Sequence, residues 1–167
     1  GCTPIQFAER VGLLESNALL VHVNYLADEE LELLAGSACS IAYCPRAHAF
    51  FDHEPHRFRE MMAAGVNVCL GTDSLASNDS LSILDEWRFL HTRHSDLDLP
   101  FLLRLSTINA AVALGVEADV GSLEPGKLAD FITVPAASPS PRDAMEEILT
   151  DPVEPRAVYI GGREVSA

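Results

Sequence analysis

Three continuous apolar runs divide the first half of this chain. They cover residues 17–26, 39–45 and 66–73, and each has the length of a buried β-strand. Polar positions rarely alternate with the apolar ones, which is typical of strands covered on both faces of their sheet. The runs therefore predict three strands at the centre of an α/β body.

Segments with helical periodicity lie before, between and after these runs. Gly36, Gly65 and Gly115 each follow such a segment and predict where its helix ends. The alternation of strands and helices predicts parallel strands joined by right-handed crossovers. The predicted helices cover "TPIQFAERVGLLE", "EELELLAGS", "PHRFREMMAAG", "SLSILDEWRFLHTR" and "PFLLRLSTINAAVALG".

The first two predicted helices carry start signals. Thr3 suits the N-cap of the first, with a proline at the first helical position. We expect Phe7, Val11 and Leu14 to share one face of this helix. Asp28 is expected to cap the second helix.

The pattern of apolar and turn-forming residues changes at Gly121. From there, "GSLEPGKLADFITVPA" and "EPRAVYIGGREVSA" predict short strands set among Gly and Pro, a small β layer outside the α/β body. The Pro/Ser-rich residues 135–141 between them predict a surface loop.

Composition narrows the class of protein. A chain of 167 residues with 48% hydrophobic residues can form one domain with a sizeable core. The formal net charge of −14 argues against nucleic acid or an anionic membrane as partner. Apolar runs stay well short of the roughly 20 residues that a membrane span needs. The sequence shows no secretory signal pattern, so we expect a cytoplasmic protein.

The cysteines and the start of the chain add two expectations. The four cysteines form no C-x-x-C pair, and three lie in or beside apolar runs, which favours buried free thiols over a disulfide framework. The chain opens with Gly1 rather than methionine and enters helical sequence at once. We therefore expect a fragment of a longer protein.

Candidate functional residues lie at the carboxyl ends of the predicted strands, because active sites in parallel α/β folds lie at those ends. Asp73 ends the third run, and its carboxylate can bind a metal ion or accept a proton from bound water. The alternative is an N-cap of the next helix, but Asn78 or Ser80 is better placed for that. His22 interrupts the first run; it is either a satisfied core histidine or a second titratable group at a shared mouth.

The segment after the second strand offers further titratable groups. Cys44 with His48 as its base can form a nucleophilic pair, although a stiff Cys-Pro turn with a buried thiol is the simpler interpretation. His53 and His56 can form a metal pair, but the proline between them favours a loop. We interpret Arg46 and His48 as candidate substrate contacts.

The helix after Asp73 also carries charged, aromatic and histidine side chains. We interpret Trp87 as a packing residue and Glu86 as a helix-surface charge, with bracing of the strand mouth as the alternative for Glu86. His91 and His94 end the same helix, where a cationic side chain complements the helix dipole.

Four segments resemble signatures of the amidohydrolase superfamily, in its cytosine-deaminase-like and chlorohydrolase-like branch. They follow the family's order from about Asn17 to the C-terminus, and "GTDS" together with "PGKLAD" makes the resemblance specific. The resemblance implies a (β/α)₈ TIM-type barrel holding one Zn²⁺ or Fe²⁺, beside a small β-sandwich. The segments are "LVHVNYLADEELELLA", "YCPRAHAF", "AGVNVCLGTDSLASNDSLSILDE" and "GSLEPGKLADFITV".

The resemblance also implies roles for individual residues. Asp73 matches the family's eighth-strand metal ligand, which acts as a base toward the metal-bound water. His22 matches the sixth-strand histidine, which touches that water or polarises the substrate. Ser74, next to Asp73 in the same signature, joins the candidate substrate contacts. In the family, metal-bound hydroxide attacks a C–N or C–Cl carbon.

The departures from the family pattern concern the missing metal ligands. No His-x-His occurs in these 167 residues. The chain would then comprise the last strands and helices of the barrel (residues 1–118) and the β-sandwich strands with the C-terminal tail (residues 119–167). The remaining ligands would come from the N-terminal half of the barrel or from another subunit. Because the open barrel face would expose apolar surface, we expect a homo-oligomer.

The substrate pocket would also differ from that of many relatives, because Pro45-Arg46-Ala47-His48 stands where they have Pro-x-Ser-Asn. We predict a metal-dependent hydrolase of C–N bonds other than peptide bonds. Its reaction would be deamination of a heterocyclic amine or a related dechlorination, with a small-molecule substrate, and the isolated fragment would be inactive. The alternative is a non-catalytic structural or assembly module that retains the closing half of the barrel fold.

Overall fold

The computed structural model describes residues 1–165, which form a mixed α/β fold. Three parallel strands make the first sheet in the order β1-β2-β3. The prediction of parallel strands is confirmed, although each strand is shorter than its apolar run. The bounds are β1 (Leu19–Val21), β2 (Ser40–Tyr43) and β3 (Asn67–Leu70).

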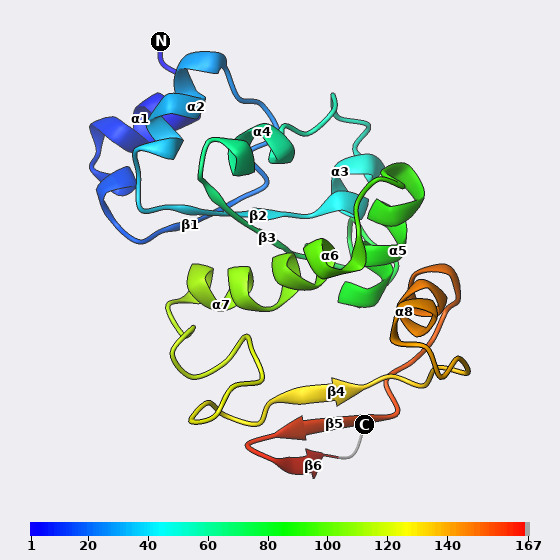
Figure 1. Cartoon of the computed structure of the whole chain (residues 1–167). Coiled ribbons are helices and arrows are strands. Elements are labelled where there is room, and N and C mark those ends of the chain that lie inside the picture. The colour runs from blue at the N-terminus through cyan, green and yellow to red at the C-terminus, as the bar shows by residue number, and fades with distance from the viewer. Residues whose placement is uncertain (166–167) are drawn as a thin grey trace.

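Helices lie on both sides of this sheet (Figure 1), as the apolar strands indicated. Helices α1, α2 and α4 lie on one side, and α6 and α7 lie on the other. The main hydrophobic cluster joins the sheet residues Ile41 and Val68 to Leu34, Met61 and Leu102 of three different helices. The bounds are α1 (Pro4–Arg10), α2 (Asp28–Ala35), α3 (Pro45–Phe50), α4 (Phe58–Ala63), α5 (Ile83–Arg93), α6 (Leu99–Ser106) and α7 (Ile108–Leu114).

Helix α1 begins as predicted but buries a different face. Thr3 caps it and forms a capping box with Gln6. Phe7 and Val11 are 58% and 59% exposed, and Ile5 and Ala8 are the buried residues of the helix. The helix ends at Arg10 and a 3₁₀ turn, Leu13–Glu15, follows, so Leu14 reaches the core from a separate element and does not mark the buried face of α1.

Helix α2 starts one residue earlier than predicted. Ala27 occupies the N-cap position, and Asp28 is the first helical residue rather than the cap. Glu30 reaches back so that its Oε2 accepts the Ala27 N–H at 2.8 Å. Since this carboxylate already satisfies the capping position, Asp28 is left in the first turn, where it favours the helix dipole.

The predicted helix over residues 100–115 is two helices, α6 and α7. The break falls at Thr107, which has φ −119° and ψ −90°. The Thr107 hydroxyl donates back to the Leu103 carbonyl at 2.7 Å, a local bond that competes with a continuous helix. After the break, Asn109 Nδ2 donates to the Val68 carbonyl of β3 at 2.9 Å and ties α7 to the sheet.

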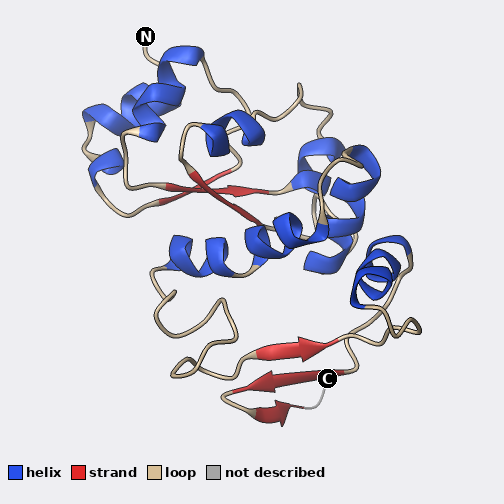
Figure 2. Ribbon diagram, in the orientation of Figure 1, coloured by secondary structure: helices blue, strands red, loops and turns tan. Residues whose placement is uncertain are grey.

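The C-terminal part forms a second, antiparallel sheet in the order β4-β5-β6, consistent with the predicted β layer. Figure 2 shows helices between the two sheets. A helix missing from the prediction, α8 (Pro141–Thr150), lies between β4 and β5 in sequence, and Ser140 caps it. Its Leu149 joins the main core, so this stretch folds back onto the α/β body. The strands are β4 (Phe131–Thr133), β5 (Ala157–Ile160) and β6 (Arg163–Val165).

Every helix within residues 1–165 is too short or too polar to cross a bilayer.

Candidate active site

His22 and Asp73 lie side by side beyond the carboxyl ends of β1 and β3. The distance from His22 Nε2 to Asp73 Oδ2 is 3.9 Å, and the side chains are 35% and 28% exposed. This distance is longer than a hydrogen bond, so both groups can still bond a third group between them. Parallel pairing brings the two residues together, because it places the ends of β1 and β3 at one edge of the sheet.

The backbone turns sharply at both residues. His22 has φ 70°, Val23 has φ 51° and Asp73 has φ 59°, all in the left-handed region that non-glycine residues rarely adopt. Each such residue costs on the order of 1 kcal/mol. His22 still donates its N–H to the Ala42 carbonyl at 2.9 Å, so the ladder of β1 continues up to the turn.

Asp73 is held by its own loop. Ser77 Oγ donates to Asp73 Oδ2 at 2.6 Å, and Asn78 Nδ2 donates to the Thr72 carbonyl at 2.8 Å. The N-cap of α5 is Ser82, which accepts the Asp85 N–H, so Asp73 is free of the capping role. The expected cap at Asn78 or Ser80 is therefore wrong, because the helix begins later than its apolar pattern suggests.

His48 lies beside this pair and is buried. Its Nδ1 is 3.0 Å from Asn24 Oδ1, and its Nε2 is 2.9 Å from the Glu54 carbonyl oxygen. Burial is the main cause that lowers the pKa of His48, and the bond to the Glu54 carbonyl opposes this shift. A cavity of about 230 Å³ opens here, lined by His22, Asn24, Ala47, His48, Phe51 and His53.

His53 and His56 lie in a loop, as the proline between them indicated, and they bond different partners. His53 Nδ1 is 2.9 Å from the Tyr25 hydroxyl. His56 stacks on Tyr43, and its Nε2 is 2.6 Å from the His22 carbonyl oxygen. His56 thus supports the turn at His22, a contact that the sequence pattern did not reveal.

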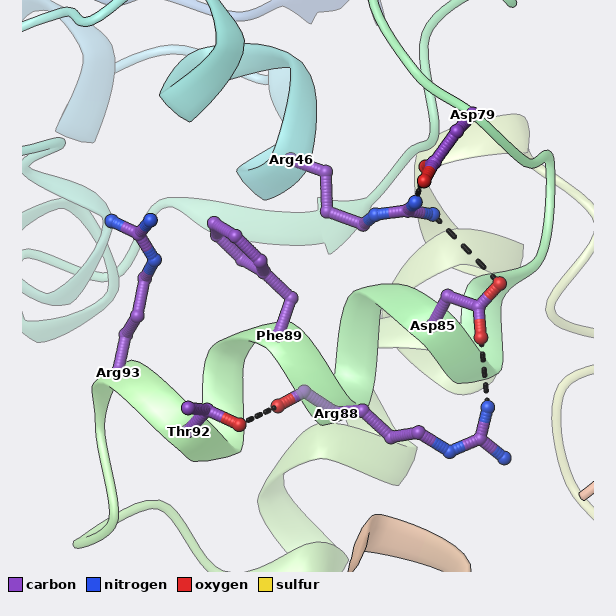
Figure 3. Close-up of a pocket in the computed structure, with 7 residues that line it drawn as sticks. All are labelled: Arg46, Asp79, Asp85, Arg88, Phe89, Thr92 and Arg93. Carbon is purple, nitrogen blue, oxygen red and sulfur yellow. Dashed lines mark hydrogen bonds and ion pairs between the residues drawn. The ribbon is translucent and has the colours of Figure 1, made fainter. Parts of the chain in front are cut away.

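The Arg46 side chain contacts the loop before α5 and the first turn of α5. Figure 3 shows its guanidinium facing Asp79 and Asp85, with the Phe89 ring between Arg46 and Arg93. These side chains line a second cavity of about 520 Å³. A substrate contact by Arg46 stays a prediction, and the structure gives its guanidinium acidic partners of its own chain.

Ser74 is exposed and accepts the Ala76 N–H at 3.3 Å in the loop after Asp73. Its hydroxyl is therefore available to a ligand at the strand mouth, and its assignment as a substrate contact also stays a prediction.

Cys44 is unsuited to nucleophilic catalysis. The residue is 2% exposed. Burial, with the negative charge of Asp73 as a smaller cause, raises the pKa of its thiol to about 12. His48 directs its ring nitrogens to Asn24 and Glu54 instead. The Cys44–His48 alternative is therefore disfavoured, whereas buried free thiols at Cys39, Cys44 and Cys69 are confirmed.

Glu86 departs from its predicted place. It is fully buried rather than a helix-surface charge, and its carboxylate bonds both Arg46 and Asn78. An apolar helical stripe through Leu84, Trp87 and Leu90 adjoins it, and this stripe is the one sequence signal that pointed toward burial.

The metal-capable side chains are too few for a complete metal centre. In residues 1–165, no group of three or more His, Cys, Asp or Glu side chains is placed to hold an ion. Structural and catalytic zinc sites use three or four protein ligands. Asp73 and His22 offer one oxygen and one nitrogen ligand, so the described residues alone supply too few ligands for a zinc ion.

Comparison with known proteins assigns the chain to a family. The model of the amidohydrolase family matches residues 1–165. The chain belongs to the amidohydrolase family. This confirms the resemblance carried by the four sequence segments.

Curated relatives are about one-third identical to this amidohydrolase chain over the residues that match. The 5-methylthioadenosine/S-adenosylhomocysteine deaminase of Moorella thermoacetica is 35% identical over 146 residues, which cover 83% of this chain and 34% of the relative. The chain therefore spans about a third of the length of such relatives.

Solved structures show the same fold. An adenosine deaminase from Xanthomonas campestris with bound zinc matches with a TM-score of 0.85 and 26% identity, over 96% of this chain and 39% of that one. Atrazine chlorohydrolase from Arthrobacter aurescens, complexed with zinc, matches with a TM-score of 0.85 and 26% identity, over 98% and 39%.

Proposed function

We propose that this chain is the C-terminal portion of a metal-dependent hydrolase that deaminates a heterocyclic amine. The observation that carries the proposal is the approach of His22 and Asp73 to 3.9 Å at the carboxyl ends of two parallel strands. Relatives named as deaminases of adenine-containing compounds favour deamination over dechlorination, with a purine nucleoside as the substrate.

The architecture follows from the same proposal. Residues 1–118 are the last strands and helices of a (β/α)₈ barrel, and residues 119–167 are the β-sandwich strands and tail. The three parallel strands, and the coverage of only 39% of the zinc-bound deaminase, support a partial barrel. We propose that the N-terminal half of the barrel, or another subunit of a homo-oligomer, completes the site.

One Zn²⁺ or Fe²⁺ is the proposed cofactor, with Asp73 as one of its ligands. The zinc bound in two structural neighbours supports this choice. Because residues 1–165 contain no group of three metal-capable side chains, the other ligands must come from outside these residues. When bound, such an ion lowers the pKa of a coordinated water.

The side chains of this chain provide positioning and proton transfer. Hydrolytic deamination forms a bond between the water oxygen and the ring carbon and breaks the bond from that carbon to the amino nitrogen. The amino group gains the proton that the water loses and leaves as ammonia. We assign Asp73 as the group that accepts the water proton, with Ser77 holding its Oδ2. His22 Nε2 faces the same space and can donate to the reacting centre.

Substrate contacts are proposed for His48, Ser74 and Arg46. His48 lines the cavity beside His22 and is held there through Asn24. Ser74 is exposed next to Asp73. Arg46 is the weakest of the three, because its guanidinium is already paired with acidic residues.

Ammonia release from 5′-methylthioadenosine, adenosine, cytosine and guanine tests the proposal in the full-length protein that carries this chain. Asp73→Asn should abolish the release, while Asp119→Asn, an exposed carboxylate outside the site, should leave it unchanged. Equal turnover in both variants would remove Asp73 from the mechanism. A metal-loaded full-length protein that turns over none of these amines, nor a chlorinated triazine, would favour the non-catalytic assembly module.

A further inference from the structure

Glu86 is a carboxylate without contact to solvent. It lies in α5 and is 0% exposed, between the buried Leu84 and Trp87. Burial raises its pKa, and hydrogen bonds from Arg46 and Asn78 oppose that rise. A buried carboxylate is costly unless each oxygen has a partner, so its partners explain why it is tolerated here.

The two oxygens of Glu86 bond two different segments of the strand mouth. Oε2 accepts the backbone N–H of Arg46, at the start of α3, with an N–O distance of 3.0 Å. Oε1 accepts from Asn78 Nδ2 at 2.7 Å. The same amide nitrogen donates to the carbonyl of Thr72, the residue before Asp73, at 2.8 Å. One side chain therefore joins the β2–α3 corner to the loop that carries Asp73.

A second cross-link connects the same two segments. The Arg46 guanidinium pairs with Asp79, and its Nη1 bonds Ser80 Oγ at 2.9 Å, as Figure 3 shows for the acidic partner. Arg46 Nη1 also lies 4.0 Å from Glu86 Oε1, which offsets the buried negative charge. Backbone and side chain of Arg46 thus both connect to the loop and helix that follow β3.

Packing alone does not hold the loop after β3. Asp73 has a left-handed backbone, and Leu75 projects into solvent. Ser77 is the buried residue of this stretch, and it bonds Asp73. The position of Asp73 relative to α3, where His48 lies, therefore depends on polar bonds more than on apolar contacts.

We propose that Glu86 is a positioning residue, a buried clamp that fixes the Asp73 loop against the start of α3. Its catalytic consequence rests on the proposed function of Asp73, but the clamp itself is a property of the fold. A displacement of a reacting group by about 1 Å can cost about a hundredfold in rate, so loosening the clamp should reduce turnover.

Hydrogen exchange in the full-length protein tests the clamp without any activity measurement. Glu86→Gln places an amide where two donors converge, so peptides over residues 44–48 and 71–79 should exchange about tenfold faster. Glu30→Gln is the matched control, because Glu30 is also buried and also bonds a backbone N–H, yet it lies at the junction of α1 and α2. It should leave both peptides unchanged.

A second variant separates the two arms of the clamp. Asn78→Ala removes the partner of Oε1 and the bond to Thr72, so exchange should rise over residues 71–79 and stay unchanged over residues 44–48. This variant keeps the buried Glu86 bonded to Arg46, and it serves if Glu86→Gln fails to fold. Unchanged exchange in both variants, or the same increase in Glu30→Gln, would overturn the clamp.

Kinetics then test the positioning role. Glu86→Gln should lower kcat by about tenfold to a hundredfold and change KM by less than about threefold, because positioning acts on the transition state. A lowered kcat without faster exchange, or an equal loss in Glu30→Gln, would overturn the positioning role. A wild-type protein without turnover would contradict the proposed function, while the exchange result would still decide the clamp.

Discussion

The Ser77 hydroxyl donates to the Asp73 carboxylate across 2.6 Å, and Ser77 is the buried member of an otherwise accessible loop. A hydrogen bond to a charged group contributes roughly 1.5 to 3 kcal/mol. The bond therefore restricts a carboxylate whose own backbone is in the left-handed region. It ties the orientation of Asp73 to a residue that carries no chemistry of its own.

Ser77→Ala should therefore reduce turnover by about tenfold with little change in KM, because Asp73 keeps its charge but loses its fixed orientation. Steady-state kinetics of the full-length protein measure this. Ser122→Ala is the matched control, since Ser122 Oγ also donates to a nearby carboxylate at 2.6 Å, that of Glu124. Equal losses in both variants would contradict a specific role for Ser77.

His22→Ala should lower turnover by about a hundredfold or more while the metal content of the full-length protein stays near that of the wild type. The reason is the proposed order of the site, in which Asp73 is a metal ligand and His22 acts on the water or substrate. Metal analysis and kinetics on the same preparation measure both quantities. His22→Asn removes the imidazole but keeps a residue that tolerates the left-handed backbone at φ 70°, so it tests the ring alone. A metal-free His22→Ala protein would instead make His22 a ligand.

The sequence allowed the prediction of the parallel sheet and of the meeting of His22 and Asp73. Nearly uniform apolar runs indicated strands covered on both sides, and parallel strands place their carboxyl ends at one edge. Helix α8 was also within reach of prediction: Ser140 before Pro141 is a helix-start signal, and Met145 and Leu149 are spaced four apart. The Pro/Ser-rich stretch before it obscured that signal.

Other features depend on tertiary geometry that a pattern does not encode. The break at Thr107 interrupts a continuous helical pattern, and the bond from Asn109 to β3 requires the sheet to be in place. The burial of Glu86 depends on the approach of Arg46, which is 40 residues away in the sequence. For such residues the sequence shows which polar group is present, but its hydrogen-bond partner depends on the tertiary structure.

Thiol reactivity checks the exclusion of cysteine catalysis. Cys2 is exposed, and Cys39, Cys44 and Cys69 are buried. Of these four thiols, a maleimide near pH 7 should therefore modify Cys2 rapidly and the other three only after unfolding, because burial also raises the pKa of the Cys44 thiol to about 12. Mass spectrometry of the labelled full-length protein, with Cys2→Ser as control, follows the sites. Rapid labelling of Cys44 with loss of activity would restore the cysteine-dependent alternative.

The pH dependence of stability should report on His56. Burial is the main cause that lowers its pKa to about 4, and the neighbouring His48 and His22 lower it further, while its bond to the His22 carbonyl opposes the shift. In the unfolded chain the pKa of His56 is about 6.5. Between about pH 4 and 6.5, His56 is therefore neutral in the folded protein and takes up a proton when the protein unfolds. His56 therefore lowers the free energy of unfolding by roughly 3 kcal/mol in total as the pH drops through this window. Above the window it does not change the free energy of unfolding with pH.

His56→Phe should flatten this fall, because phenylalanine keeps the stacking on Tyr43 but carries no titratable group. Urea unfolding at several values between pH 4 and 7 measures the slope in the wild type and the variant. The variant also loses the bond to the His22 carbonyl, so its stability at pH 7 should be about 1 kcal/mol lower while its slope is smaller. An identical slope in both proteins would show that other groups control the acid sensitivity of the fold.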